Sequence, residues 1–178
     1  MEQIRKNVSP YSNDARNRYV TDGITNTLIN LLKERPMSEI SISEICQNAC
    51  VGRTSFYRNY ETKEDVIKKY IRNLTAKWQK EYDASGSDSN AILYGSLFQH
   101  LKDYSEFFLL LKKRDLFHLY LEVFIEIFGA KPEDNNMVAY TKNFITYGTF
   151  GWIEAWIARG MEESADTMTA MLSAHGMK

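Results

Sequence analysis

Side chains that can recognise DNA are concentrated between positions 53 and 58. The segment contains Arg53, Thr54, Ser55, Tyr57 and Arg58. Guanidinium and hydroxyl groups donate hydrogen bonds to phosphate oxygens and to base edges in the major groove, which is about 12 Å wide. The residue types therefore predict non-covalent reading of a DNA duplex.

Two short helices joined by a tight connection are expected to position these side chains. Residues 41–49 form the first helix, and Ser41-Ile42-Ser43-Glu44 has the pattern of a capping box, in which the hydroxyl and the carboxylate each bind a free amide of the first turn. After the connection at 50–52, residues 53–60 form the second helix, with Phe56 and Tyr60 facing inward. This arrangement is the helix-turn-helix unit.

A long helix is expected on each side of this unit. The helix at 13–34 has apolar residues at helical spacing and is closed by Pro36. A second cap at Thr62-Lys63-Glu64-Asp65 opens a helix over 62–81, which connects to the rest of the chain. The polar loop at 83–90 follows it.

The run from Ile42 to Val66 resembles the N-terminal signature of TetR-type transcriptional regulators, and the resemblance extends over roughly residues 13–75. The Phe56-Tyr57 pair, the aromatic Tyr60 and the Lys63-Glu64 pair all coincide with that signature. The resemblance implies a bacterial, all-helical homodimer that binds a palindromic operator. It also implies a divergent C-terminal domain that senses a ligand and forms the dimer interface, and a connecting helix whose motion changes the separation of the recognition helices.

The resemblance further assigns roles within the signature. It implies base-reading and groove-lining roles for Arg53, Thr54, Ser55 and Tyr57. Phosphate contacts are implied for Tyr57, Asn59 and Lys63, the last helped by a helix dipole, and a backbone contact for Ser43. Two alternatives stay open: Ser43 is equally compatible with ordinary solvation, and Arg58 with an ion pair to Glu61 or Glu64.

Three positions depart from the family pattern. Cys50 stands where a turn glycine is common, Gly52 where a serine or threonine cap is common, and Asn59 where histidine is common. These departures affect the operator sequence and the Asn59 contact more than the fold. A redox role for Cys50 has little support, because no neighbouring residue in the sequence lowers its pKa.

The charge of the chain is unevenly distributed. The 178 residues include 22 Lys and Arg against 23 Asp and Glu, yet residues 1–80 carry a net charge of +5 and residues 81–178 a net charge of −6. A basic N-terminal part fits phosphate binding.

The composition excludes disordered, collagen-like and disulfide-scaffold classes. No apolar run reaches the roughly 20 residues of a membrane span. The N-terminus lacks the features of a signal peptide, so a cytoplasmic protein without membrane association is expected.

The second half of the chain is rich in aromatic residues. Between Tyr94 and Trp156 lie 15 of the 23 Phe, Trp and Tyr residues, and most of them are expected to be core. An excess of large rings that pack imperfectly also suggests a small-molecule pocket. The candidates for lining it are Phe98, Phe107, Phe117, His118, Tyr120, Phe124 and Tyr147.

The helices near 136–160 and 164–175 carry more apolar surface than one chain end covers easily, which favours a two-fold four-helix interface. Small residues at 148, 151, 155 and 158 make a stripe where another helix can approach closely. The interface candidates are Phe144, Gly148, Gly151, Trp152, Ala155, Trp156, Ala158, Met168, Met171 and Leu172. One-sided packing inside the subunit is the alternative.

The sequence thus predicts an all-α protein of about nine helices. Residues 1–61 form a three-helix, helix-turn-helix DNA-binding domain, and residues 62–178 form a regulatory and dimerisation domain. The expected function is a homodimeric repressor released from its double-stranded DNA operator by a small-molecule effector. The alternatives are a regulator or activator controlled by a partner protein, or a helical interaction module without DNA binding.

No enzyme, cofactor or metal site is expected, because His100, His118 and His175 lack ligand spacing and Cys46 and Cys50 lack a second pair. The run at 151–161 resembles the dihydroxyacetone-kinase-regulator branch of the family.

Overall fold

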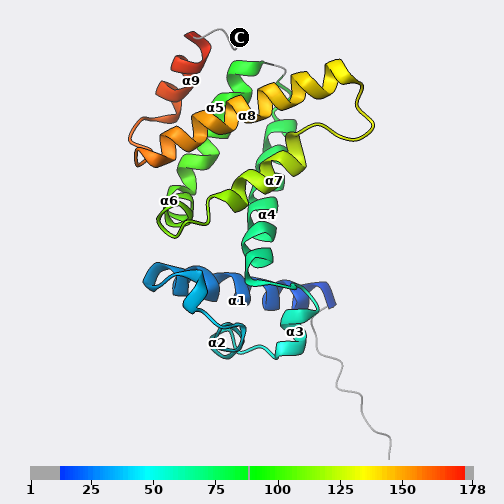
Figure 1. Ribbon diagram of the computed structural model, residues 1–178, viewed down its shortest axis with the longest axis vertical. Helices are drawn as coiled ribbons and strands as arrows, with labels where there is room; N and C mark the ends of the chain where they lie inside the picture. Colours follow the sequence, from blue (N-terminus) through cyan, green and yellow to red (C-terminus); the bar gives the residue numbers. More distant parts are fainter. Residues whose placement is uncertain (1–12, 88, 175–178) are drawn as a thin grey trace, which may run out of the picture. The chain divides into compact units, whose positions relative to one another are not determined.

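The computed structural model describes residues 13–87 and 89–174; His175 lies outside these ranges (Figure 1). The described residues form nine α-helices and one short 3-10 helix, with no strand among them, which confirms the all-α prediction. The chain divides into two compact units, one ending at Val66 and the other beginning at Ile67. The division lies inside helix α4 (Lys63–Ala84).

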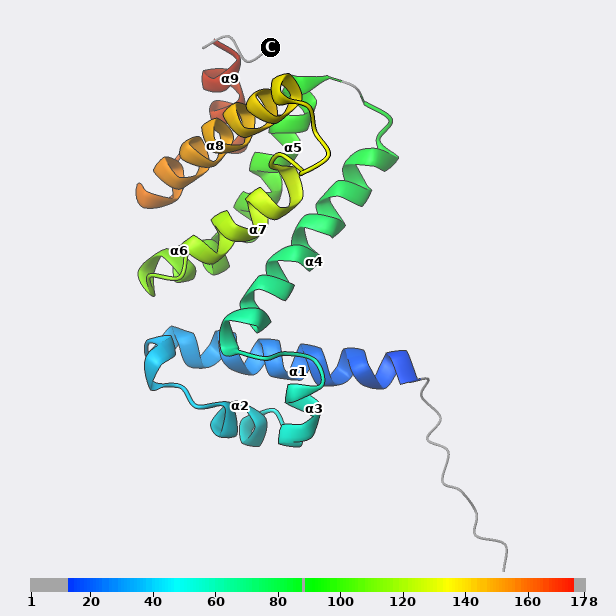
Figure 2. The same cartoon turned by 45° about the vertical axis from the view of Figure 1, so that its right-hand side comes forward.

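The first unit holds α1 (Asn13–Glu34), the 3-10 helix η1 (Met37–Glu39), α2 (Ile42–Asn48), α3 (Arg53–Tyr57) and the first turn of α4. Ile24, Leu28 and Leu32 of α1 recur every four residues and are fully buried. Helix α2 packs against both α1 and α3. Phe56 and Tyr60 are buried, as the spacing predicted. Figure 2 shows the two short helices α2 and α3 following one another around a tight turn.

The two predicted capping boxes differ in the structure. At α4 the box is complete, because the Thr62 hydroxyl accepts from the Asp65 amide at 3.1 Å and the Asp65 carboxylate accepts from the Thr62 amide at 2.8 Å. At α2 the Ser41 hydroxyl accepts from the Glu44 amide at 3.1 Å. The Glu44 carboxylate instead pairs with the Arg35 guanidinium. The prediction for the Glu44 carboxylate was therefore wrong, because a charged donor was available to it.

The second unit contains the rest of α4 and five further helices. These are α5 (Asn90–Asp103), α6 (Ser105–Lys113), α7 (His118–Phe128), α8 (Asn136–Ala158) and α9 (Ala165–Ala174). Helix α9 packs along α5, and α8 packs against α6 and α7. Asn135 caps α8 by accepting from the Val138 amide at 3.0 Å. None of the helices in the described ranges is long and apolar enough to cross a membrane.

Aromatic side chains form the centre of the second unit. Tyr120 lies 5.1 Å from Phe108 and 5.5 Å from both Phe117 and Phe124, measured between ring centroids. On another side of the unit, Phe98 meets Trp156 edge-on at 5.7 Å. Burial raises the pKa of Tyr120 well above its ordinary value. The rings therefore act mainly as core, as the sequence predicted.

Candidate functional site

The turn that leads into α3 shows the structural consequence of two departures from the family pattern. Cys50 adopts a φ of 54°, the left-handed region that favours glycine. Gly52 is the N-cap of α3 and provides no side-chain hydrogen bond. The helix consequently begins without the hydroxyl cap that is usual at such a position.

Most of the predicted DNA-contacting side chains lie on the surface of the first unit. Arg53, Thr54, Tyr57 and Arg58 are exposed, and Ser55 is half-buried. Phe56, on the same helix, is completely buried and touches the Tyr57 ring edge-on at a centroid distance of 5.5 Å. One anchored side chain thus holds a short helix whose other side chains face solvent.

Helix α3 is shorter than predicted and ends at Tyr57, so Arg58 and Asn59 follow it. The side-chain amide of Asn59 donates from Nδ2 to the Ser55 carbonyl at 2.9 Å and thereby closes the last turn. Within the described ranges Arg58 forms no ion pair with Glu61 or Glu64. Ser43 is exposed on α2, so the contact expected of it stays a prediction.

Lys63 occupies a position that the sequence did not reveal. Its ammonium group donates to the carbonyl oxygens of Met37 and Ile40, each at 2.6 Å, and the side chain is half-buried. These bonds join the start of α4 to the η1 segment. An ammonium has three donors, so two are used here, and the predicted phosphate contact of Lys63 stays a prediction.

The seven predicted pocket residues do not line one common site in the structure. Phe98, Phe107, Phe117, Tyr120 and Phe124 are buried. His118 is exposed, and Phe117 and His118 border a depression of about 210 Å³. Tyr147 is 52% exposed and lies away from the aromatic core.

Phe124 is the one predicted pocket residue that lines a cavity of about 220 Å³ between α4, α5, α7 and α8. Its other main lining residues are Trp78, Tyr94, Phe128, Lys142 and Thr149. Sequence reasoning missed these five. Trp78 lies in the helix predicted over 62–81, and Lys142 and Thr149 have no recognisable signal in the sequence.

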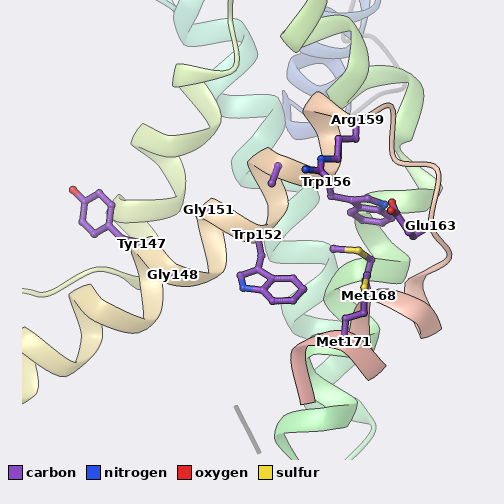
Figure 3. A pocket seen from close by; sticks show the side chains of 10 residues that line it. Tyr147, Gly148, Gly151, Trp152, Trp156, Arg159, Glu163, Met168 and Met171 are labelled. Carbon is purple, nitrogen blue, oxygen red and sulfur yellow. The ribbon is translucent and has the colours of Figure 1, made fainter. Parts of the chain in front are cut away.

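A larger groove of about 490 Å³ lies along α8 and α9 (Figure 3). Its lining includes Gly148, Gly151, Trp152, Ala155, Trp156, Met168 and Met171, which are all predicted interface residues, together with Tyr147. Trp156, Met168 and Leu172 are nevertheless buried within the single chain, at 2%, 4% and 1% exposure. Phe144, Gly151, Ala155 and Ala158 are exposed. The interface role of the set stays a prediction.

The described residues contain no group of three or more His, Cys, Asp or Glu side chains placed to hold a metal ion. Cys46 and Cys50 are free thiols. Burial raises the pKa of Cys46, against the opposing effect of the Arg53 charge.

Comparison with known proteins supports this organisation. Residues 93–175 match the family model TetR_C_8, described as a transcriptional regulator C-terminal region. The crystal structure of Lin0861 from Listeria innocua, determined to 2.8 Å, is similar over 94% of each chain, with a TM-score of 0.74 and 14% sequence identity. At this identity the similarity establishes the fold alone. No curated protein sequence matches the chain.

A helix-turn-helix unit followed by a helical unit defines the general class of helical transcriptional regulators. The match of residues 93–175 to a TetR C-terminal region supports a TetR-family transcriptional regulator. The finer resemblance to the dihydroxyacetone-kinase-regulator branch stays a prediction.

Proposed function

We propose that this regulator binds a palindromic DNA operator as a homodimer, with α3 of each subunit in the major groove. The observation that best supports this proposal is the difference in side-chain burial within α3: Phe56 is buried, whereas Arg53 and Thr54 are exposed. The anchored helix presents donors of the kinds that read base edges. The role is recognition and switching, without catalysis.

Selection of bound duplexes from a random pool tests the DNA-binding part. We expect two inverted half-sites separated by about one helical turn or a multiple of it. Fluorescence anisotropy then measures affinity as a function of salt. Arg53→Ala is expected to cost about 1–3 kcal/mol in each half-site, and Thr54→Ala to change the preferred bases. Lys113→Ala, an exposed cation of α6, is the control. Binding that neither depends on salt nor selects a sequence contradicts the proposal.

The proposed dimer rests on an apolar row along α8. Met137, Tyr140, Phe144 and Tyr147 follow one another at helical spacing and are 75%, 70%, 78% and 52% exposed. Continuous apolar surface of this kind is typical of interaction sites. A two-fold axis places the same row of two subunits face to face, so a second copy covers it.

The small residues that continue this row allow a sharp test. A Cβ atom built on Gly151 meets no atom within 4 Å, so a side chain can start there without a clash within one chain. At a close helix–helix contact the same side chain prevents approach. Gly151→Leu is therefore expected to convert the dimer to monomer in sedimentation experiments without loss of helicity. Ala76→Leu, at an exposed position of α4, is the control. A Gly151→Leu protein that remains dimeric contradicts this interface.

We further propose that a small molecule bound in the second unit lowers operator affinity and so relieves repression. The cavity between α4, α5, α7 and α8 supports this proposal, because it includes a residue of the connecting helix, Trp78. Control by a partner protein is the second possibility, favoured by the exposed row on α8. Co-purification of a second protein bound to that row, in place of a second copy, is the result that selects it.

A further inference from the structure

Thr149, which lines the cavity between α4, α5, α7 and α8, has an unusual hydroxyl group. Thr149 is 3% exposed, and its Oγ1 has no hydrogen-bond partner among the described residues. Two other helical threonines of this unit have one: Thr75 donates to the Ile71 carbonyl at 3.0 Å and Thr169 to the Ala165 carbonyl at 2.8 Å. A buried hydroxyl without a partner is costly. Thr149 is therefore the exception that needs a reason.

Three other polar side chains of the cavity already have partners. The Thr146 hydroxyl donates to the Phe128 carbonyl at 3.0 Å, and the Trp78 indole N–H donates to the Ser96 hydroxyl at 3.0 Å. Lys142 binds both carboxylate oxygens of Asp134 at 2.8 Å. The positive charge at the cavity is thus neutralised, and a charged ligand gains no unpaired counter-ion to offset its desolvation.

The size and walls of the cavity limit what it accepts. An apolar cavity of about 150 Å³ holds one benzene molecule, so about 220 Å³ holds one ring with a short substituent. The rings of Trp78, Phe124 and Phe128 contribute to the lining. Aromatic walls favour stacked or edge-on contact with another ring.

We propose that the cavity binds a neutral, single-ring compound that carries one hydrogen-bond acceptor, and that Thr149 supplies the donor. Threonine in a helix has two accessible χ1 rotamers. Rotation by about 120° moves the hydroxyl to another staggered position, and the proposal requires that this turn the shielded Oγ1 toward the cavity. The inference rests on the proposed function, since it names the chemical class of the effector.

Three probes of equal non-hydrogen atom count separate these features. They are acetophenone, which is neutral with an acceptor, isopropylbenzene, which lacks one, and benzoate, which is charged. Calorimetry on the full chain without DNA measures their affinities. We expect acetophenone to bind best, with a dissociation constant between about 10 µM and 1 mM. Thr149→Val replaces the hydroxyl by a methyl of similar shape and is expected to weaken acetophenone about two- to tenfold, with isopropylbenzene unchanged or tighter.

Thr169→Val is the matched control, because that hydroxyl already has a partner and is not part of the cavity lining; it leaves both affinities unchanged. Binding of none of the three probes overturns the inference, as does tighter binding of benzoate or an equal effect of Thr149→Val on both neutral probes. A failure of the proposed function can be distinguished from a failure of this inference, because operator affinity is measured separately from ligand binding. If acetophenone binds as expected while operator affinity in anisotropy is unaltered, the ligand class is supported and its role as effector is refuted.

Discussion

Replacing Lys63 by methionine removes an ammonium group and retains most of the aliphatic stem. The ammonium donates to two carbonyl oxygens, and the carbonyl of Met37 also accepts the Ile40 amide at 3.2 Å, so it keeps one partner after the substitution. Hydrogen bonds to charged groups contribute about 1.5–3 kcal/mol each. With partial exposure and one retained partner, we expect a total loss of about 1.5–3 kcal/mol.

For a chain of this length such a loss lowers the melting temperature by about 3–12 °C. Calorimetric unfolding without DNA measures it, and Lys80→Met, at an exposed lysine of the same helix, is the control. Operator binding at several salt concentrations gives the second readout. Loss of one phosphate contact in each subunit lowers the salt slope by about 1.8 for a dimer. We expect the slope to remain near that of the wild type.

The reverse pattern refutes this reasoning. Suppose that Lys63→Met has the melting temperature of the wild-type protein and lowers the salt slope by about 1.8. The ammonium then binds a phosphate, and its hydrogen bonds to Met37 and Ile40 do not contribute to the free energy of unfolding. A loss in both readouts assigns both roles to Lys63, with the third N–H reaching the phosphate.

Three further perturbations follow from the geometry. Cys50→Gly relieves a left-handed residue and is expected to raise the free energy of unfolding by about 0.5–1 kcal/mol in urea titrations; Cys50→Ala, which keeps the conformation, should change it little, and equal effects contradict the explanation. The hydrogen bond from Lys142 lowers the pKa of Asp134, so the pair stabilises the fold above the ordinary aspartate pKa, near 4. The stability difference between wild type and Lys142→Met should persist from pH 7 down to about pH 4 and vanish below it, whereas a difference that grows in acid contradicts the sign. Arg72→Met breaks an exposed bidentate pair with Glu126, which should cost at most about 1 kcal/mol of chemical stability; a larger loss refutes the weak-pair argument.

The helices were predictable because each has local signals. The spacing of Ile24, Leu28 and Leu32 marks one buried stripe of α1, and all three are buried. Thr62 and Asp65 lie three residues apart and cap α4 reciprocally. Such signals act within a few residues of one another, so a single sequence contains them completely.

The sequence did not reveal contacts that depend on groups distant in the chain. Glu44 binds Arg35, nine residues away, instead of completing its local cap. The Lys63 ammonium binds carbonyls 26 and 23 residues earlier in the chain. No local pattern encodes either choice, because both depend on how the turn at η1 folds back. The cavity around Thr149 escaped prediction for the same reason, since four helices contribute to it.

Helix α4 is the element on which the proposed switch depends, because the boundary between the two compact units lies within it. In the first unit α4 is attached by the buried Val66 and by the directional hydrogen bonds of Lys63 to the carbonyls of Met37 and Ile40. In the second unit its ion pairs with α7, such as Arg72 to Glu126, are exposed and therefore weak. Trp78 is 6% exposed, contacts the Phe128 ring and lines the cavity, so we expect its environment to change when the cavity fills. Under the proposed function, we expect a ligand there to act on the helix through the buried indole of Trp78, and the helix to act on the first unit in part through the Lys63 ammonium. Coupling of this kind is sensitive to two side chains that the charge and hydropathy patterns of the chain do not distinguish from their neighbours.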